Sequence, residues 1–552
     1  MGRLLVIPLA LIVMLTGALA WSGGGASQRV DFRFINRGDI ITLDPNQMSY
    51  VQDIRMAYAM WEGLYTYDSR TYMPVPGTAS GCDISADKRV YTFHLRHEAR
   101  WSNGDPVTAG DFVFAWKRML DEPGDYTYLH YYIKGAEKYV EDAAAHRPVE
   151  FKTVGVEALD PHTLRVTLND PVTFFLDLMA FSPFLPLHAK SMEPFKEVDA
   201  RTGKVTYSQH FTRPPHVVCN GPFVLKKWDF KRRLVLEKNA HYWDMAHVKS
   251  DSMEMVVCDD RLSQLMMFDS GAVDWLAEVS SDVVPELLAK GNKDLKSFVG
   301  FGTCFLTLMV KPTYLDGTPN PLVDRRLRQA LAMALDRNQI VRNITRCGEA
   351  PATRFIPPEI FQSLGWRSTP GIDFDPHRAK QLLAEAGYPN GGRLPGVKYV
   401  FRSGIPLSRD LAESCARQWK QVLNLDIPLV QAEQQMIKQM LNKKDYALAA
   451  SQWSGDYNDP STFTDKYLST SINNDAGWVN AEYDQLLKEA TKEPDAQTRL
   501  RLLEKAERIL NTEVPIIPIY HITSQYMYRD NLKGITPNPR LVTMFKDVEV
   551  VK

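Results

Sequence analysis

The stretch KDYALAASQWSGDYNDPSTF, residues 444–463, joins an apolar run to a loop that contains two acids, an amide and a proline. Its first half, residues 444–453, is a short apolar run typical of a buried strand. Asp456 and Asp459 then follow the end of that strand, where ligands of α/β proteins gather. The same residues also suit a plain turn, with Asp456 as the acceptor of an Asx-turn and Asp459-Pro460 reversing the chain. The rest of the chain has to decide between a binding loop and a turn.

Short strands alternate with capped helices along most of the chain. Residues 90–96, VYTFHLR, alternate as a strand does, and Thr108 with Asp111 forms an acidic variant of a capping box before the next helix. Farther on, Asp375 precedes Pro376 as an N-cap precedes the first helical residue. This interleaving predicts an α/β fold.

Length and charge limit the domain count and the partners. The chain has 552 residues, 44% of them hydrophobic, which is beyond the size at which a single core stops growing, so we expect two or three domains. Its 65 basic and 66 acidic residues leave a formal charge of -1, so no global field would attract nucleic acid or an anionic membrane. We therefore expect a small partner, or one that is met through a local surface.

The N-terminus has the pattern of an export signal. Residues 1–20, MGRLLVIPLALIVMLTGALA, place one arginine before an apolar stretch that ends in a small-x-small cleavage pattern. The alternative is an uncleaved anchor, because the apolar residues 4–20 approach the lower limit for spanning a bilayer. No cysteine follows at the position where a lipoprotein is acylated. The sequence thus predicts an exported protein that is not a lipoprotein.

Signatures of catalysis and of metal binding are missing from the sequence. It contains no Gly-x-Ser-x-Gly elbow, no His-Glu-x-x-His, no Walker loop and no Gly-x-Gly-x-x-Gly. The six cysteines have no Cys-x-x-Cys spacing, and their pairing stays open. His94 and His97 point to opposite faces of the predicted strand, so they do not share a metal readily. We predict no cofactor, no metal and no enzymatic activity, and keep a secreted hydrolase as a remaining alternative.

Several longer stretches follow one another along the chain. They are ITLDPN (41–46), WEGLY (61–65), YTFHLRHEARWSNGDPVTAGDFVFAWKR (91–118), CNGPFVLKKW (219–228), LEKNAHYWD (236–244), VDRRLRQALAMALDR (323–337), LLAEAGY (382–388) and WSGDYNDPSTF (453–463). This set, in order and at similar spacing, resembles the large periplasmic oligopeptide-binding proteins that serve ABC importers, which belong to the peptide and nickel class of solute-binding proteins.

The resemblance implies a two-lobed, hinged periplasmic binding protein fold of the large three-domain type, whose lobes close over a ligand. After the signal peptide (1–20), a discontinuous domain I would comprise residues 28–61, 189–301 and 521–552. An inserted domain II would span 62–188, and domain III, the opposing lobe that anchors the ligand, would span 302–520. A monomeric receptor that delivers oligopeptides to a membrane permease is implied.

The resemblance also implies a binding site around the opening stretch. Asp456 would capture the N-terminal ammonium of a peptide, since a desolvated charge must be paired and hydrogen-bonded. Gly455 would let the backbone approach closely, while Trp453 and Tyr457 would form apolar walls. Main-chain contacts are implied at Tyr50, Val51, Gln452 and Ser454, and aromatic contacts at Tyr126 and Phe305.

Some positions depart from the family pattern, and three of them concern the ligand's C-terminus. Ala450 stands where family members have an arginine for the carboxylate, Ser408 replaces a histidine, and Ser49 replaces an acid. Ser454 occupies the position of a cysteine that relatives use in a disulfide. Arg402 is a substitute for carboxylate binding, although it also suits a solvated surface. A nickel chelate, a sugar oligomer or a cell-wall peptide is the alternative ligand on the same fold.

Overall fold

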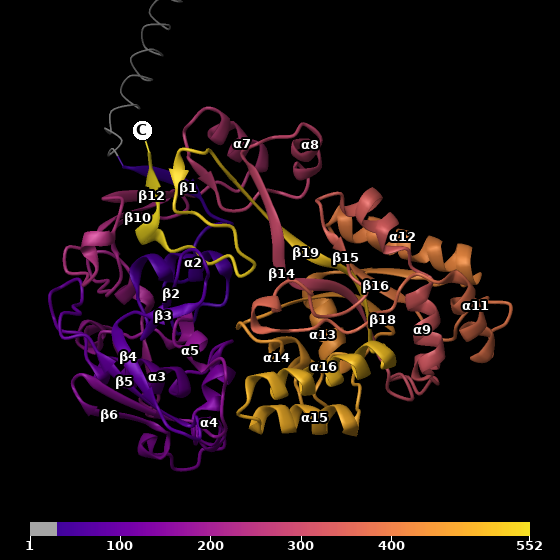
Figure 1. Cartoon of the computed structure of the whole chain (residues 1–552), viewed down its shortest axis with the longest axis horizontal. Helices are drawn as coiled ribbons and strands as arrows, with labels where there is room; N and C mark the ends of the chain where they lie inside the picture. The colour runs from indigo at the N-terminus through magenta and orange to yellow at the C-terminus, as the bar shows by residue number, and fades with distance from the viewer. Residues whose placement is uncertain (1–29, 552) are drawn as a thin grey trace, which may run out of the picture.

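The computed structural model describes residues 30–551 and consists of two lobes (Figure 1). A large mixed sheet extends through both lobes and confirms the predicted α/β class. Its strands, in spatial order, are β10 (Phe223–Asp229), β11 (Arg233–Lys238), β12 (Ser252–Val256), β1 (Phe32–Ile35), β13 (Trp275–Leu276), β19 (Ile516–Tyr528), β14 (Leu295–Leu308), β18 (Leu448–Ser454), β16 (Tyr399–Arg402) and β17 (Leu429–Ala432), with β15 (Ala350–Pro351) beside β19.

Two long strands, β14 and β19, connect the lobes (Figure 1). They pair antiparallel in two runs, 295–299 with 523–527 and 303–307 with 516–521, separated by a register shift. Gly302 lies in this shift, and a Cβ atom there would lie 2.4 Å from the carbonyl oxygen of Trp453. Because no side chain fits at that distance, glycine is required where β14 meets β18.

The first lobe contains a second, antiparallel sheet. Its strands, in spatial order, are β4 (Ala79–Ile84), β5 (Val90–Leu95), β7 (Thr163–Thr167) and β6 (Val156–Asp160). Short strand pairs are β2 (Tyr65–Tyr67) with β3 (Pro74–Pro76), β8 (Lys196–Val198) with β9 (Val205–Tyr207), and β20 (Leu532–Lys533) with β21 (Glu549–Val550). The helices are α2 (Val51–Met60), α3 (Ala109–Asp121), α4 (Ala136–Ala144), α5 (Phe175–Leu178), α6 (Ala189–Met192), α7 (Arg261–Asp269) and α8 (Val284–Ala289). The predicted capping box of Thr108 and Asp111 is present at the start of α3.

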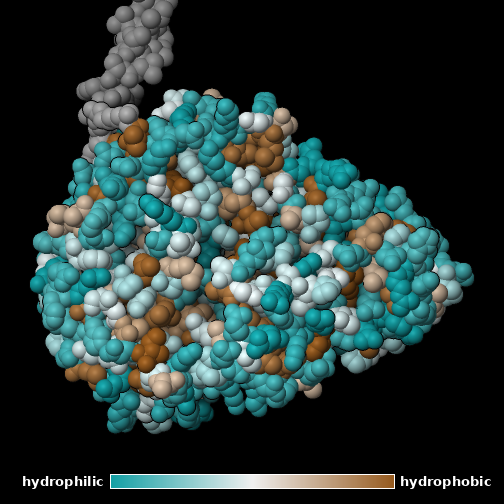
Figure 2. All heavy atoms as spheres, in the orientation of Figure 1, coloured by the Kyte–Doolittle hydropathy of each residue, from teal (hydrophilic) through white to brown (hydrophobic). Residues whose placement is uncertain are grey.

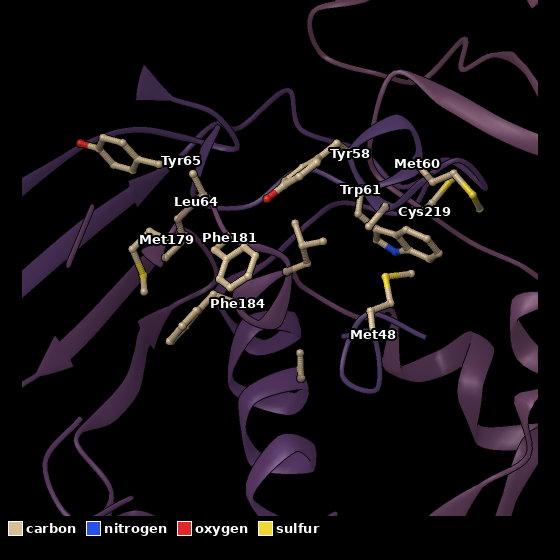
Figure 3. Packing of buried hydrophobic residues seen from close by; sticks show 14 of the residues in the cluster. Met48, Tyr58, Met60, Trp61, Leu64, Tyr65, Met179, Phe181, Phe184 and Cys219 are labelled. Carbon is tan, nitrogen blue, oxygen red and sulfur yellow. The ribbon is translucent and has the colours of Figure 1, made fainter. Parts of the chain in front are cut away.

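Helix α2 packs into the main core of the first lobe, which both sheets share. Most of its residues are buried, and its last residue is followed by Trp61, which is 2% exposed. Figure 3 shows Tyr58, Leu64 and Phe181 close together on one side, and Trp61 near Met48, Met60 and Cys219 on the other. This packing fixes the direction of α2 and therefore the position of the residues along its remaining face.

The second lobe packs its helices around three further cores. They are α9 (Arg325–Met333), α10 (Arg337–Ile340), α11 (Pro376–Glu385), α12 (Pro406–Leu423), α13 (Gln434–Lys443), α14 (Ser461–Thr464), α15 (Ala481–Lys492) and α16 (Ala496–Glu513). Asp375 caps α11 through the N–H groups of His377 and Arg378, as predicted. Cys415 is fully buried on α12.

Several sequence predictions concern the chain outside this core. The predicted signal peptide, residues 1–20, lies outside the described residues. Within residues 30–551, no helix combines the length and the apolar character needed to span a bilayer. The six cysteines all lie in this range and are all free thiols. The face in Figure 2 is mostly hydrophilic, with hydrophobic residues in small separate groups.

Candidate ligand-binding site

A cavity of about 460 Å³ lies between the lobes. The first lobe contributes one face of α2 and the segments after β1 and β13, and the second lobe contributes the end of β18. Its lining residues are Arg37, Ser49, Tyr50, Val51, Ile54, Arg55, Tyr58, Tyr126, Phe181, Ala277, Glu278, Val279, Ser281, Phe301, Gln452, Ser454, Gly455, Asp456, Ile522, Thr523, Ser524, Gln525, Tyr526, Pro539, Arg540, Leu541 and Val542.

Most predicted site residues line this cavity. They are Tyr50, Val51, Tyr126, Gln452, Ser454, Gly455 and Asp456. A second cavity, of about 480 Å³, lies in the first lobe and contains none of the predicted residues; Thr42, Glu122 and Trp228 are among its lining. The interlobe cavity is therefore the candidate site.

Asp456 lies at one end of the cavity, directly after β18. Its carboxylate accepts a 2.5 Å hydrogen bond from the hydroxyl of Tyr128, which belongs to the opposite lobe. Its backbone N–H donates to Oγ1 of Thr462 at 2.8 Å, and its carbonyl accepts from Nη2 of Arg540 at 3.3 Å. Backbone contacts thus hold the residue on both sides, and no ion pair within residues 30–551 neutralises its carboxylate.

Burial raises the pKa of Asp456 to about 6, although the Tyr128 hydrogen bond and the positive charge of Arg540 both lower it. Desolvation is the largest cause, because the lobes exclude water from the charged form of the acid. A cationic ligand group beside this carboxylate would lower its pKa again, because the positive charge favours the ionised acid. The site is therefore poised to bind a cation.

Gly455 is required by close packing beside the acid. A Cβ atom at this position would lie 2.6 Å from the ring of Phe301 and 2.8 Å from a methyl group of Thr462. The N–H of Gly455 donates to the carbonyl of Phe301 at 2.8 Å, which joins the loop to β14. The glycine therefore lets the acidic loop lie against the strand that connects the lobes.

Trp453 and Tyr457 do not line the cavity, which corrects the expectation that they form its walls. Neighbouring residues of a strand point to opposite faces. Gln452 and Ser454 point into the cavity, so Trp453 points away from it. Its indole N–H donates to the carbonyl of Thr462 at 2.8 Å and so holds the loop from behind. Tyr457 instead stacks on Phe174 of the first lobe, with ring centroids 4.2 Å apart.

Phe305 and Arg402 also lie elsewhere, which corrects two further expectations. Phe305 is fully buried in a core of the second lobe, with its ring 5.2 Å from that of Phe355, and Phe301 lines the cavity instead. The pairing of β14 shifts register between 299 and 303 and again between 304 and 305. These shifts turn the side chain of Phe301, and not that of Phe305, toward the ligand side. Arg402 ends β16 with an exposed side chain, and its N–H donates to Oγ of Ser408. Neither Arg402 nor Ser408 reaches the cavity.

The sequence interpretation missed the residues that support Asp456 from a distance. Arg540 forms a buried 2.6 Å ion pair with Asp177, which also accepts the N–H of Asn458 at 3.1 Å. Asp177 and the other acidic and phenolic groups around Arg540 raise its pKa despite its burial. No spacing in the chain signals these contacts, because their partners come from different domains of the predicted layout.

The described residues hold no group of three or more histidine, cysteine, aspartate or glutamate side chains that could bind a metal ion. What the cavity offers instead is the carboxylates of Asp456 and Glu278, arginines at other positions, aromatic rings and the main chain of β18. These groups suit a ligand that has a cationic end, an anionic end and amide groups between them.

Comparison with known proteins identifies the class of protein to which this fold and cavity belong. Residues 73–475 match the family described as bacterial extracellular solute-binding proteins, family 5. The chain is 33% identical to the oligopeptide-binding protein OppA of Bacillus subtilis (strain 168), over 84% of this chain and 82% of that protein. Its fold is similar to that of the murein tripeptide binding protein MppA of Escherichia coli, with a TM-score of 0.76 and 26% identity over 95% of this chain and 99% of that one.

A second solved structure is that of Haemophilus influenzae OppA in complex with RPPGFSPFR. It has a TM-score of 0.74 and 25% identity over 95% of this chain and 100% of that chain. Fold and cavity together define a two-lobed solute-binding protein. The chain belongs to the family of bacterial extracellular solute-binding proteins, family 5.

Proposed function

We propose that this protein is an extracytoplasmic receptor that binds oligopeptides between its lobes and delivers them to the permease of an ABC importer. The observation that carries the proposal is the carboxylate of Asp456, which lies in the interlobe cavity with a hydroxyl partner and a raised pKa. A peptide ammonium that loses its water in the cavity needs such a partner. The names of the relatives, which include oligopeptide-binding proteins and a murein tripeptide binding protein, support the same ligand class.

The main chain of β18 supports a peptide over other ligands. One edge of β18 pairs with β14 along its full length, from Leu448 to Ser454. On its other edge, β16 pairs only with Leu448 and Ala449. In the part of the chain that the structure describes, no strand covers that edge from Ala450 onward, so an extended peptide can pair with it as an added strand. Such main-chain bonds bind a peptide without selecting its side chains.

Export, domain layout and closure form part of the same proposal. Residues 1–20 would act as a cleaved signal peptide without lipid attachment, and the protein would work as a monomer without turning over its ligand. Residues 28–61, 189–301 and 521–552 would form domain I, 62–188 domain II and 302–520 domain III. The register shift between Val299 and Thr303 would then be the hinge, because fewer ladder bonds resist bending there.

The test is to identify the natural ligand and to vary its amino end. Native mass spectrometry of the protein purified from its own cells should detect bound peptides. Titration calorimetry with one peptide, free and N-acetylated, should show binding of the free form alone. Co-purification of a nickel chelate or a sugar oligomer, or equal binding of both peptide forms, would refute the proposal. Recovery of the peptide intact after incubation would separate a receptor from a secreted hydrolase.

A further inference from the structure

Two arginines, Arg37 and Arg55, line the cavity on the side of the segments after β1 and β13. Helix α2 runs along the cavity, with Tyr58 near its C-terminal end and Tyr50 at its start. Tyr58 lies toward Asp456, because its ring packs against Tyr67, whose ring centre is 4.8 Å from the guanidinium of Arg540. Arg540 also binds the carbonyl of Asp456. The start of α2 contacts the segment after β1, where the side-chain amide of Asn36 donates to the carbonyl of Gln52 at 3.0 Å.

Arg37 and Arg55 meet around the same asparagine. Oδ1 of Asn36 accepts the backbone N–H of Arg37 at 2.9 Å and also a guanidinium N–H of Arg55. Both arginines line the cavity. Strand β19 gives the separation from the Asp456 end. Ile522 lies beside Gly302 and Ser454, and three residues farther on Gln525 accepts the N–H of Val279, next to Glu278, so the two places are about 10 Å apart along the strand. The cavity therefore has an acidic end and a basic end.

The basic end has more positive than negative charge. The side chain of Arg37 is 55% exposed and forms a 3.0 Å ion pair with Glu278, which is 43% exposed. Arg55 is 1% exposed, and its guanidinium lies 5.6 Å from the ring centre of Trp275. Among the described residues Arg55 has no acidic partner within ion-pair distance, and its Nε has no hydrogen-bond acceptor. A buried guanidinium without a counter-ion favours the approach of an anion.

We propose that Arg37 receives the C-terminal carboxylate of the bound peptide, with Arg55 adding positive charge behind it. This inference rests on the proposed peptide-binding function. To bind the carboxylate, Arg37 breaks its ion pair with Glu278 or contacts both acids at once. This costs little free energy, because an exposed ion pair contributes little to stability. A guanidinium binds a carboxylate through two parallel hydrogen bonds, so it recognises the C-terminal carboxylate of the peptide. The site replaces the carboxylate contacts that are absent at Ala450 and Ser408.

The other arginines do not serve this role. Arg540 is already paired with Asp177 in a buried 2.6 Å contact at the ammonium end. Arg402 lies outside the cavity. The distance between the two ends also sets a length, since an extended peptide spans about 3.3 to 3.6 Å per residue. About 10 Å then corresponds to a peptide of about three residues.

The experiment is titration calorimetry with alanine-based peptides of three, four and six residues, each as the free acid and as the C-terminal amide. The wild-type protein should bind the tri- and tetrapeptide acids at least tenfold more tightly than the amides. Arg37→Gln should lose that preference and leave amide binding unchanged. Arg261→Gln is the matched control, because Arg261 forms an exposed ion pair with Asp282 in the same lobe and does not line the cavity.

Glu278→Gln removes the competing acid and should strengthen binding of the short free acids without affecting the amides. The six-residue peptide should respond little to either change, because its carboxylate extends past Arg37. Equal losses for acid and amide in Arg37→Gln, or no loss for either, would overturn this inference while leaving peptide binding in place. Failure of the wild-type protein to bind any of the peptides would overturn the proposed function, and this inference with it.

Discussion

The hydroxyl of Tyr128 donates a hydrogen bond to the carboxylate of Asp456, 328 positions farther along the chain, and this bond joins the two lobes. The donor is neutral, so it orients the carboxylate without cancelling its charge. A ligand ammonium can therefore bind the remaining lone pairs of an acid that this hydrogen bond has already positioned.

Replacing Asp456 by asparagine should weaken peptide binding by about 3 to 5 kcal/mol, or two to three decades, because the ligand ammonium is left buried without a counter-charge. Titration calorimetry at pH 7.5 measures the loss. Asp426→Asn is the control, since Asp426 lies in an exposed ion pair with Lys420 in the same lobe. Unchanged affinity in Asp456→Asn would refute the assignment of the ammonium site.

Peptide affinity should fall as the pH drops through about 6. Burial raises the pKa of Asp456 to about 6 in the free protein, and a bound ammonium favours the ionised form, so binding below this pH must release a proton. The affinity should be constant between about pH 7 and 7.5 and decrease about tenfold per pH unit below 6. Calorimetry in buffers of different ionisation enthalpy measures the released proton. The same pH dependence in Asp456→Asn would assign it to another group.

Tyr128→Phe should move the midpoint of that pH dependence upward. The Tyr128 hydrogen bond lowers the pKa of Asp456, whereas burial raises it. Loss of the hydrogen bond should therefore raise this pKa further. Affinity measured from pH 5 to 8 gives the midpoint for each protein. Tyr131→Phe provides a comparison from the same segment, because Asp456 accepts its hydrogen bond from Tyr128 and not from Tyr131. An unchanged or lower midpoint in Tyr128→Phe would contradict the role of the hydroxyl.

Phe174→Leu should weaken closure of the lobes. Its ring stacks on Tyr457 of the opposite lobe with centroids 4.2 Å apart, and such pairs contribute about 0.5 to 1.5 kcal/mol beyond area burial. We expect a loss of affinity of up to about tenfold and a larger radius of gyration in small-angle scattering with peptide present. Phe151→Leu is the control, as Phe151 packs on Tyr139 within the first lobe. Equal effects of the two changes would indicate general destabilisation instead.

Asp459 should matter for stability where Asp456 matters for binding. Asp459 forms a 2.6 Å ion pair with Arg499, and both side chains are 6% exposed. Asp459→Asn leaves a buried guanidinium unpaired and should cost about 3 to 5 kcal/mol in the free energy of unfolding, measured by urea denaturation. The double change Asp459→Asn with Arg499→Met should recover much of this loss. A single variant as stable as the wild type would show that the pair contributes nothing.

The helix starts were predictable from the sequence because their contacts are local. Thr108 reaches Asp111 within one turn, and Asp375 caps the two residues that follow Pro376, so spacing alone encodes both contacts. The order of family motifs likewise predicted the fold class. Phe305 shows the limit of such patterns, because register shifts in β14 place Phe301 at the cavity and Phe305 in the core.

The sequence by itself determined that the chain is an α/β protein, and it placed an acid beside a glycine in the loop after one strand. Only the tertiary structure decided what surrounds that acid. Tyr128, Asp177 and Arg540 reach the loop from distant parts of the chain, and Arg37 reaches the cavity from the segment after β1, which Asn36 joins to α2. The physical reason is that caps and strand alternation depend on neighbours within a few residues, whereas the site depends on how two lobes and their strand registers fit together.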